Sequence, residues 1–244
     1  MMYKESFIGG FFVNLSLFVV QLMFFAVIYD NTFLIGEWSK YQFIFFIGTY
    51  NLIINFAMMF FYFGIIKIPQ LIRNGKMDYY ILKPCNSLLY ISFENFDLSS
   101  FPMVIFSIII TIYAAISENT RLDLLNVSLY IALLFLMCLL YYDLLVLVRC
   151  ISFYTVDISG LESVEWSLTE LNMKIPGTMY KGFLKYLFCI ILPYGLVATI
   201  PSYVFFNGIS TKVALFIACI VSLFSFLANT VWKYSLRHYR SASS

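Results

Sequence analysis

Charged residues are scarce in this sequence. Asp, Glu, Lys and Arg make up 11% of its 244 residues, hydrophobic residues make up 62%, and the mean hydropathy is +0.88. A soluble domain carries about 25% charged and roughly 45–50% apolar residues. A soluble chain of this length would need far more charge to cover its surface. The composition therefore excludes an ordinary soluble protein and indicates an integral membrane protein.

Side chains that build metal sites and catalytic triads are also missing. The single histidine, His238, lies in the C-terminal tail, which argues against a His-based zinc site or a buried Ser-His-Asp triad. The five cysteines show no CxxC pair or other metal-ligand spacing, so we expect small core residues. The sequence therefore predicts no metal site and no enzyme.

A nucleotide-binding loop is absent too. The run Asn74–Met77 lacks the upstream glycine and the following Ser or Thr that a phosphate-binding loop requires. We therefore expect this chain to bind no cofactor and not to hydrolyse ATP. The net charge of +2 gives no indication of a nucleic-acid partner.

Long apolar runs are abundant instead. A transmembrane helix needs about 20 apolar residues to cross roughly 30 Å of hydrocarbon. The first run is too long for the apolar core of a signal peptide, so we interpret it as an anchor. The sequence predicts an all-α, polytopic membrane protein with a single transmembrane domain over residues 1–244 and six transmembrane helices. Five of the expected spans are residues 7–29, 41–66, 98–116, 124–148 and 213–233.

The remaining span has two candidates. Residues 186–206 are strongly apolar but contain Pro193, Gly195 and Pro201. Residues 151–173 are acidic and amphipathic when plotted at about 100° per residue. Their apolar face carries Phe153, Val156, Leu161, Val164, Leu168 and Leu171, and their polar face carries Glu162, Glu165, Trp166 and Glu170.

The distribution of Lys and Arg bears on both topologies, because cytoplasmic loops are enriched in these residues. If residues 186–206 cross, three of the fifteen basic residues, Lys40, Arg121 and Lys212, lie outside. If residues 151–173 cross, Lys174, Lys181 and Lys185 join them, and the split is nine inside to six outside. Both topologies put the two termini in the cytoplasm, and the first fits the charge rule better.

Acidic residues at membrane depth are candidates for a translocation path, because charge is costly there. These candidates are Asp143, Asp157, Glu162 and Glu165. The alternative interpretation is structural: the carboxylates pair with Arg149 or with another subunit.

Three stretches together resemble a known family. The loop "IRNGKMDYYILKPCNSLLY" carries Gly75, Lys76, Met77, Asp78, Leu82, Lys83, Pro84 and Asn86. The penultimate segment carries Pro176, Tyr180, Pro193 and Pro201, and the tail "LRHYRSASS" carries Leu236, Arg237, Tyr239, Ser241, Ala242 and Ser244. In this order they resemble a branch of ATP-binding-cassette (ABC) type-2 permeases. The early loop "IGEW" is close to a Gly–Trp element of that branch, with Glu37 inserted.

The resemblance implies the permease subunit of an exporter in a bacterial-type plasma membrane. Two cytoplasmic ABC ATPases, which hold the ATP and magnesium, are the expected partners, together with membrane lipid and a second, homologous permease in a heterodimer. Residues 67–97 would form the cytoplasmic coupling loop. Its candidate contact residues are Leu71, Ile72, Arg73, Gly75, Lys76, Asp78, Leu82 and Pro84.

The resemblance also bears on the fifth span. By analogy, residues 151–173 cross and residues 176–206 form a re-entrant hairpin on the extracellular side. An acidic helix lying on the inner leaflet would face anionic lipid, where such helices normally carry Lys and Arg. We therefore predict the crossing, with the polar face along a cavity or against another subunit.

The abundance of aromatic residues, 20% of the chain, and the few intramembrane charges favour a lipidic, hydrophobic or peptide-like substrate. Two other functions remain open at this point. One is an ATPase-independent secondary transporter or channel, and the other is an immunity-type membrane protein.

Overall fold

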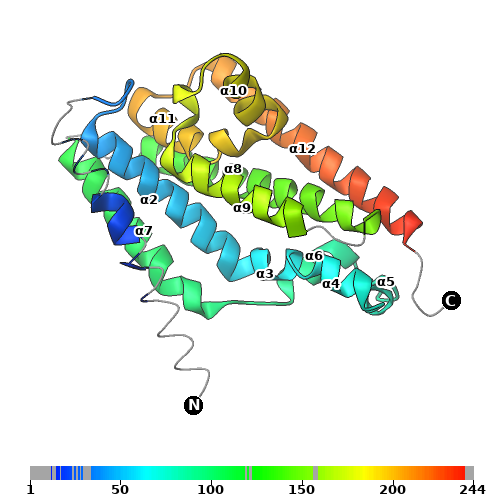
Figure 1. Ribbon diagram of the computed structural model, residues 1–244. Coiled ribbons are helices and arrows are strands. Elements are labelled where there is room, and N and C mark those ends of the chain that lie inside the picture. Colours follow the sequence, from blue (N-terminus) through cyan, green and yellow to red (C-terminus); the bar gives the residue numbers. More distant parts are fainter. Residues whose placement is uncertain are drawn as a thin grey trace.

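The chain forms a bundle of long helices, seen in a computed structural model (Figure 1). The residues described are 12, 15, 16, 18–23, 25, 27, 29, 34–118, 120, 123–155 and 159–239. Within them every regular element is a helix, apart from one isolated bridge between Ile35 and Trp38. The predicted all-α class is confirmed.

Four helical segments of the described chain are long and apolar enough to cross a membrane. The first joins α2, a π-helical turn η1, α3 and α4, and its N-terminus is fixed by reciprocal hydrogen bonds between Ser39 and Gln42. These segments correspond to four of the expected spans. Their main helices are α2 (Lys40–Ala57), η1 (Met58–Tyr62), α3 (Phe63–Ile65), α7 (Phe101–Ser117), α8 (Leu124–Cys150) and α12 (Thr211–His238).

About half of the expected first span, residues 7–29, lies outside the described residues. The positions described within it are helical. The ring of Phe18 lies 5.6 Å from Phe106 of α7, and that of Phe25 lies 4.4 Å from Phe43 of α2, between ring centroids.

The packing of the bundle is that of a protein in lipid. Helix α2 packs on α7 and α8, and α8 packs on α12. Large apolar side chains also cover the outside, among them Ile109, Ile112, Phe135, Leu223 and Phe226. A soluble protein of this size rarely exposes so much contiguous apolar surface. Hydrocarbon around the bundle removes the cost of that exposure.

Residues 67–97 form a compact group of short helices at one end of the bundle (Figure 1). We call this end, where α12 also finishes, the loop end. The group consists of α4 (Ile68–Arg73), α5 (Met77–Ile81) and α6 (Ser87–Phe93), and a 3-10 turn η2 (Leu98–Ser100) leads from it into α7.

Gly75 ends α4, as its sequence position predicts. Its φ is +65°, and two hydrogen bonds close the helix end, Gly75 N to Ile72 O at 3.2 Å and Lys76 N to Leu71 O at 2.9 Å. This pair of bonds is the Schellman arrangement, in which a left-handed residue satisfies the last carbonyls.

We expect Gly75→Ala to destabilise this turn by about 1–2 kcal/mol, because a Cβ in left-handed backbone crowds the following carbonyl oxygen. Gly75→Asn should cost less, since Asn visits that region more readily. The rate of limited proteolysis within residues 67–97 of the purified protein measures the effect. Equal rates for the wild type and the Ala variant would contradict it.

Residues 151–207 form a chain of short helices beside α8. A 3-10 turn η3 (Ile151–Phe153) precedes α9 (Ser159–Lys174), which lies along the bundle. Then follow η4 (Gly177–Met179), α10 (Gly182–Tyr186), η5 (Leu187–Ile191), η6 (Pro193–Leu196) and α11 (Thr199–Asn207). The helical pair 182–191 and 193–207 is apolar enough to span a membrane but is bent by 81° at Pro193. We call the end of the bundle that holds α10 the broken-helix end.

Helix α9 has a buried side and an exposed side. Glu165, Thr169 and Asn172 are buried, whereas Leu161 and Val164 are exposed. The two faces expected from the sequence are only partly present. Trp166 and Glu170 of the expected polar face are exposed, and Leu168 of the expected apolar face packs against the core.

Candidate functional site

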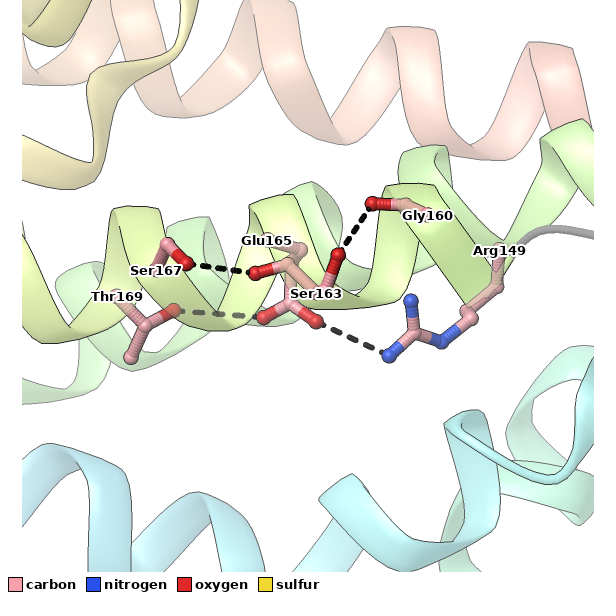
Figure 2. A network of polar contacts seen from close by, with 6 residues as sticks. All are labelled: Arg149, Gly160, Ser163, Glu165, Ser167 and Thr169. Atoms are coloured by element: carbon pink, nitrogen blue, oxygen red, sulfur yellow. Dashed lines mark hydrogen bonds and ion pairs between the residues drawn. The ribbon is translucent and has the colours of Figure 1, made fainter.

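A buried ion pair lies where α8 ends and α9 passes it. Arg149, in the last turn of α8, donates from Nη2 to Oε2 of Glu165 at 3.0 Å, and the two side chains are 3% and 2% exposed (Figure 2). Thr169 Oγ1 donates to the second carboxylate oxygen at 3.4 Å. The structural interpretation of Glu165, in which its carboxylate pairs with Arg149, thus agrees with the observed contact.

A polar pocket of about 290 Å³ adjoins this ion pair. It lies between α9 and the segment that joins α2 to α4, and it is lined by Tyr62, Ile66, Arg149, Glu162, Glu165 and Trp166. Two guanidinium nitrogens of Arg149, Nε and Nη1, are buried and have no hydrogen-bond partner among the described residues. The pocket therefore contains unused donors beside two carboxylates.

Polar contacts continue along α9 to the broken-helix end. Tyr50 of α2 donates to the carbonyl of Thr169 at 2.8 Å, and Tyr180 donates to Oδ1 of Asn172 at 3.1 Å. The polar face of α9 is thus tied both to α2 and to the residues that precede α10.

The four acidic candidates separate into two groups. Glu162 and Glu165 line the pocket. Asp143 faces the other way, where its carboxylate accepts a hydrogen bond from Ser225 of α12. Asp157 lies outside the described residues.

The candidate contact residues of the loop divide between core and surface. Leu71 and Ile72 pack against the core and are partly exposed. Gly75 and Asp78 are also partly exposed. Arg73, Lys76, Leu82 and Pro84 are exposed, and Leu82 is 83% exposed. The loop end therefore presents a mixed basic and apolar surface.

Aromatic contacts that the sequence analysis missed stiffen the loop. The ammonium of Lys83 lies 4.0 Å and 3.6 Å from the ring centroids of Tyr79 and Tyr90. Tyr80 donates to Oε2 of Glu94 at 2.6 Å, and burial followed by this contact raises the pKa of Tyr80 to about 12. The i and i+4 spacing of Tyr79 and Lys83 was a signal for one of these contacts, whereas no sequence spacing indicated the contacts with Tyr90 and Glu94.

The loop is also braced against the C-terminal ends of two long helices. Trp232 of α12 donates from Nε1 to Oγ of Ser87 at 3.4 Å, and its ring lies 5.6 Å from that of Phe153. Burial, and then the nearby negative charge of Asp78, raise the pKa of Tyr239. A residue of the family-like tail thus meets a residue of the family-like loop, a contact that no sequence spacing indicates.

A second, wholly apolar cavity of about 450 Å³ lies among α2, α7, α8 and α11. Its wall includes Phe45, Ile108, Tyr130, Phe135 and Phe205. In the described part of the chain, no three His, Cys, Asp or Glu side chains are grouped so that they could hold a metal ion.

Comparison with known proteins identifies the family. The family model described as ABC-2 family transporter protein matches residues 15–243. No curated protein matches, and no solved structure does. The match covers the bundle, the loop end and the broken helices described above, so the chain belongs to the ABC-2 transporter family and is an ABC-2 type membrane permease.

Proposed function

We propose that this chain is the membrane-spanning permease subunit of an exporter driven by a separate ABC ATPase. The cargo is a hydrophobic, lipidic or peptide-like molecule, and ATP and magnesium are bound by the partner. Two ATPase subunits and a second, homologous permease complete the assembly in a bacterial-type plasma membrane. The full chain acts as one permease domain.

The observation that carries this proposal is the exposed surface of the loop end. Arg73, Lys76, Leu82 and Pro84 offer basic and apolar groups to a partner. Behind them, Asp78 and Ser87 contact residues at or near the C-terminal end of α12. Because the loop is tied to a long helix, force applied to this surface would tilt that helix. The loop therefore acts as the coupling element.

We expect Leu82→Asp to lower the yield of co-purified ATPase at least about tenfold, because a desolvated carboxylate in an apolar contact costs more than about 1.4 kcal/mol. The measurement is the ratio of ATPase to permease after affinity purification of the complex.

Leu124→Asp is the matched control. Leu124 is also 83% exposed, and it begins α8 at the opposite end of the bundle. An acidic residue is tolerated at a helix N-terminus. If both variants lose the ATPase equally, or neither does, Leu82 does not belong to the contact surface.

We propose six spans, with α9 as the fifth and residues 176–206 as a re-entrant hairpin on the extracellular side. Trp38 donates from Nε1 to Oγ1 of Thr178 at 2.8 Å, and Gly36 lies beside Met179. Both topologies considered put residues 30–40 outside, so a contact between Trp38 and Thr178 supports an external position for Thr178. Both termini then lie in the cytoplasm.

This topology has a direct test. A cysteine at Thr178, in a background with Cys85 and Cys219 replaced by serine, should react with an impermeant thiol reagent applied to intact cells. Cys85 reintroduced alone in the loop should react only after the cells are opened. Protection of position 178 from the external reagent would contradict the hairpin.

The polar side of α9 is the proposed wall of the translocation path. Glu162 and Glu165 line its pocket, and Asp143 and Asp157 remain further candidates. In a heterodimer the second permease would supply the opposite wall.

A further inference from the structure

The pocket beside Arg149 contains cationic and anionic side chains whose hydrogen-bonding groups are only partly paired with one another. Arg149 gives one nitrogen to Glu165, and its Nε and Nη1 have no partner among the described residues, although the side chain is only 3% exposed. Leaving buried donors unpaired is costly. An acceptor supplied by a ligand would remove this cost.

Glu162 supplies the second half of the site. It lies three residues before Glu165 on α9, is partly exposed, and makes no hydrogen bond to the described residues. With one Arg and two Glu, the pocket carries a formal charge of 1 − 2 = −1. A simple anion would therefore be repelled, whereas a simple cation would leave the Arg149 nitrogens unpaired.

Two aromatic side chains, Tyr62 and Trp166, also line the pocket. Aromatic faces attract an ammonium group, Trp most strongly. The wall of the pocket also includes Ile66, an apolar residue that is partly exposed. A ligand that satisfies every group is thus amphipathic, with an anionic group, an ammonium group and an apolar tail.

We propose that this pocket binds the headgroup of an aminophospholipid of the phosphatidylethanolamine type. The phosphate accepts a hydrogen bond from Nη1 of Arg149. The ammonium lies against the Glu162 carboxylate and the faces of Trp166 and Tyr62, while the acyl chains leave the pocket past Ile66. This assignment rests on the proposed function and deepens it, because the pocket lies on the proposed wall of the translocation path and a lipid is among the proposed cargoes. Lipid binding itself requires neither ATP nor the ATPase.

The test uses the full-length protein purified in detergent and titrated with single lipids, with bound lipid counted by native mass spectrometry. The wild type should bind phosphatidylethanolamine about tenfold more tightly than phosphatidylglycerol, which lacks the ammonium, a difference of about 1.4 kcal/mol. Glu162→Gln should abolish that preference, because it removes both the partner of the ammonium and a charge that repels phosphatidylglycerol. Equal binding of the two lipids by the wild type would overturn the proposal.

Glu170→Gln is the matched control, since Glu170 lies on the same helix but is exposed and paired with Lys174 at 2.7 Å. It should keep the wild-type preference, and an equal loss in both variants would overturn the assignment to this pocket. Soluble phosphoethanolamine distinguishes the headgroup from the lipid. Competition only at concentrations far above that of the lipid supports a lipid site, and competition at equal concentration overturns it.

Discussion

Glu165→Leu should destabilise the folded protein by about 3–5 kcal/mol, the cost of breaking a buried ion pair by removing one partner. Arg149 already leaves two nitrogens without partners among the described residues, and the substitution would remove its remaining contact. The guanidinium would then be an uncompensated charge between α8 and α9. The melting temperature of the purified protein in detergent measures the loss.

Two further variants separate loss of charge balance from loss of packing. Arg149→Met combined with Glu165→Leu should recover most of the stability, because apolar replacement of both partners of a buried pair is often neutral. Glu170→Leu removes a carboxylate from an exposed pair on the same helix, where pairs contribute about 0–1 kcal/mol. If Glu165→Leu melts at the same temperature as Glu170→Leu, the buried pair is not a stabilising contact.

Gly64→Ala should loosen the attachment of the loop and cost about 1–3 kcal/mol, the usual range for overpacking. Gly64 lies in α3, and a Cβ placed on it would overlap the carbonyl oxygens of Ile91 and Ser92 in α6. Backbone atoms cannot rotate away as a side chain can, so α6 must move. Because α6 belongs to the proposed coupling element, we expect weaker coupling between ATP hydrolysis and transport.

The ratio of ATP hydrolysed to substrate moved in reconstituted vesicles measures the coupling, and the melting temperature measures the stability. Gly160→Ala is the control, since nothing lies within 4 Å of a Cβ at Gly160 and Ala favours helix by up to about 1 kcal/mol. Wild-type stability and coupling in Gly64→Ala would show that α6 and α3 are not held together through this close approach.

Several elements were predictable because their signals are local. Apolar runs of sufficient length marked the spans that became α2, α7, α8 and α12, and Gly75 marked the end of α4. Pro193 indicated the break in residues 186–206, where the helical axis bends by 81°. The family followed from several short motifs read in order along the chain.

The candidate site was less predictable. Periodicity separated a polar from an apolar face on α9. Lipid and the protein interior are both apolar surroundings, so hydrophobicity alone does not show which face packs against the protein and which faces outward. The order of residues also placed Asp143 and Glu165 together as intramembrane acids, although one bonds to Ser225 and the other to Arg149. These partners come from different helices, and their contacts depend on helix rotation.

The sequence by itself determined that this is a helical membrane protein of the ABC-2 family, since composition, run length and motif order are properties of the chain. Only the tertiary structure decided that Arg149 meets Glu165 with two nitrogens unpaired among the described residues, and that Tyr239 lies near Asp78. The physical reason is the distance along the chain over which each signal acts. The length of an apolar run and the residues of a turn are local properties of the sequence. The partner of a buried charge lies on another helix, and only the packing of the helices decides which one.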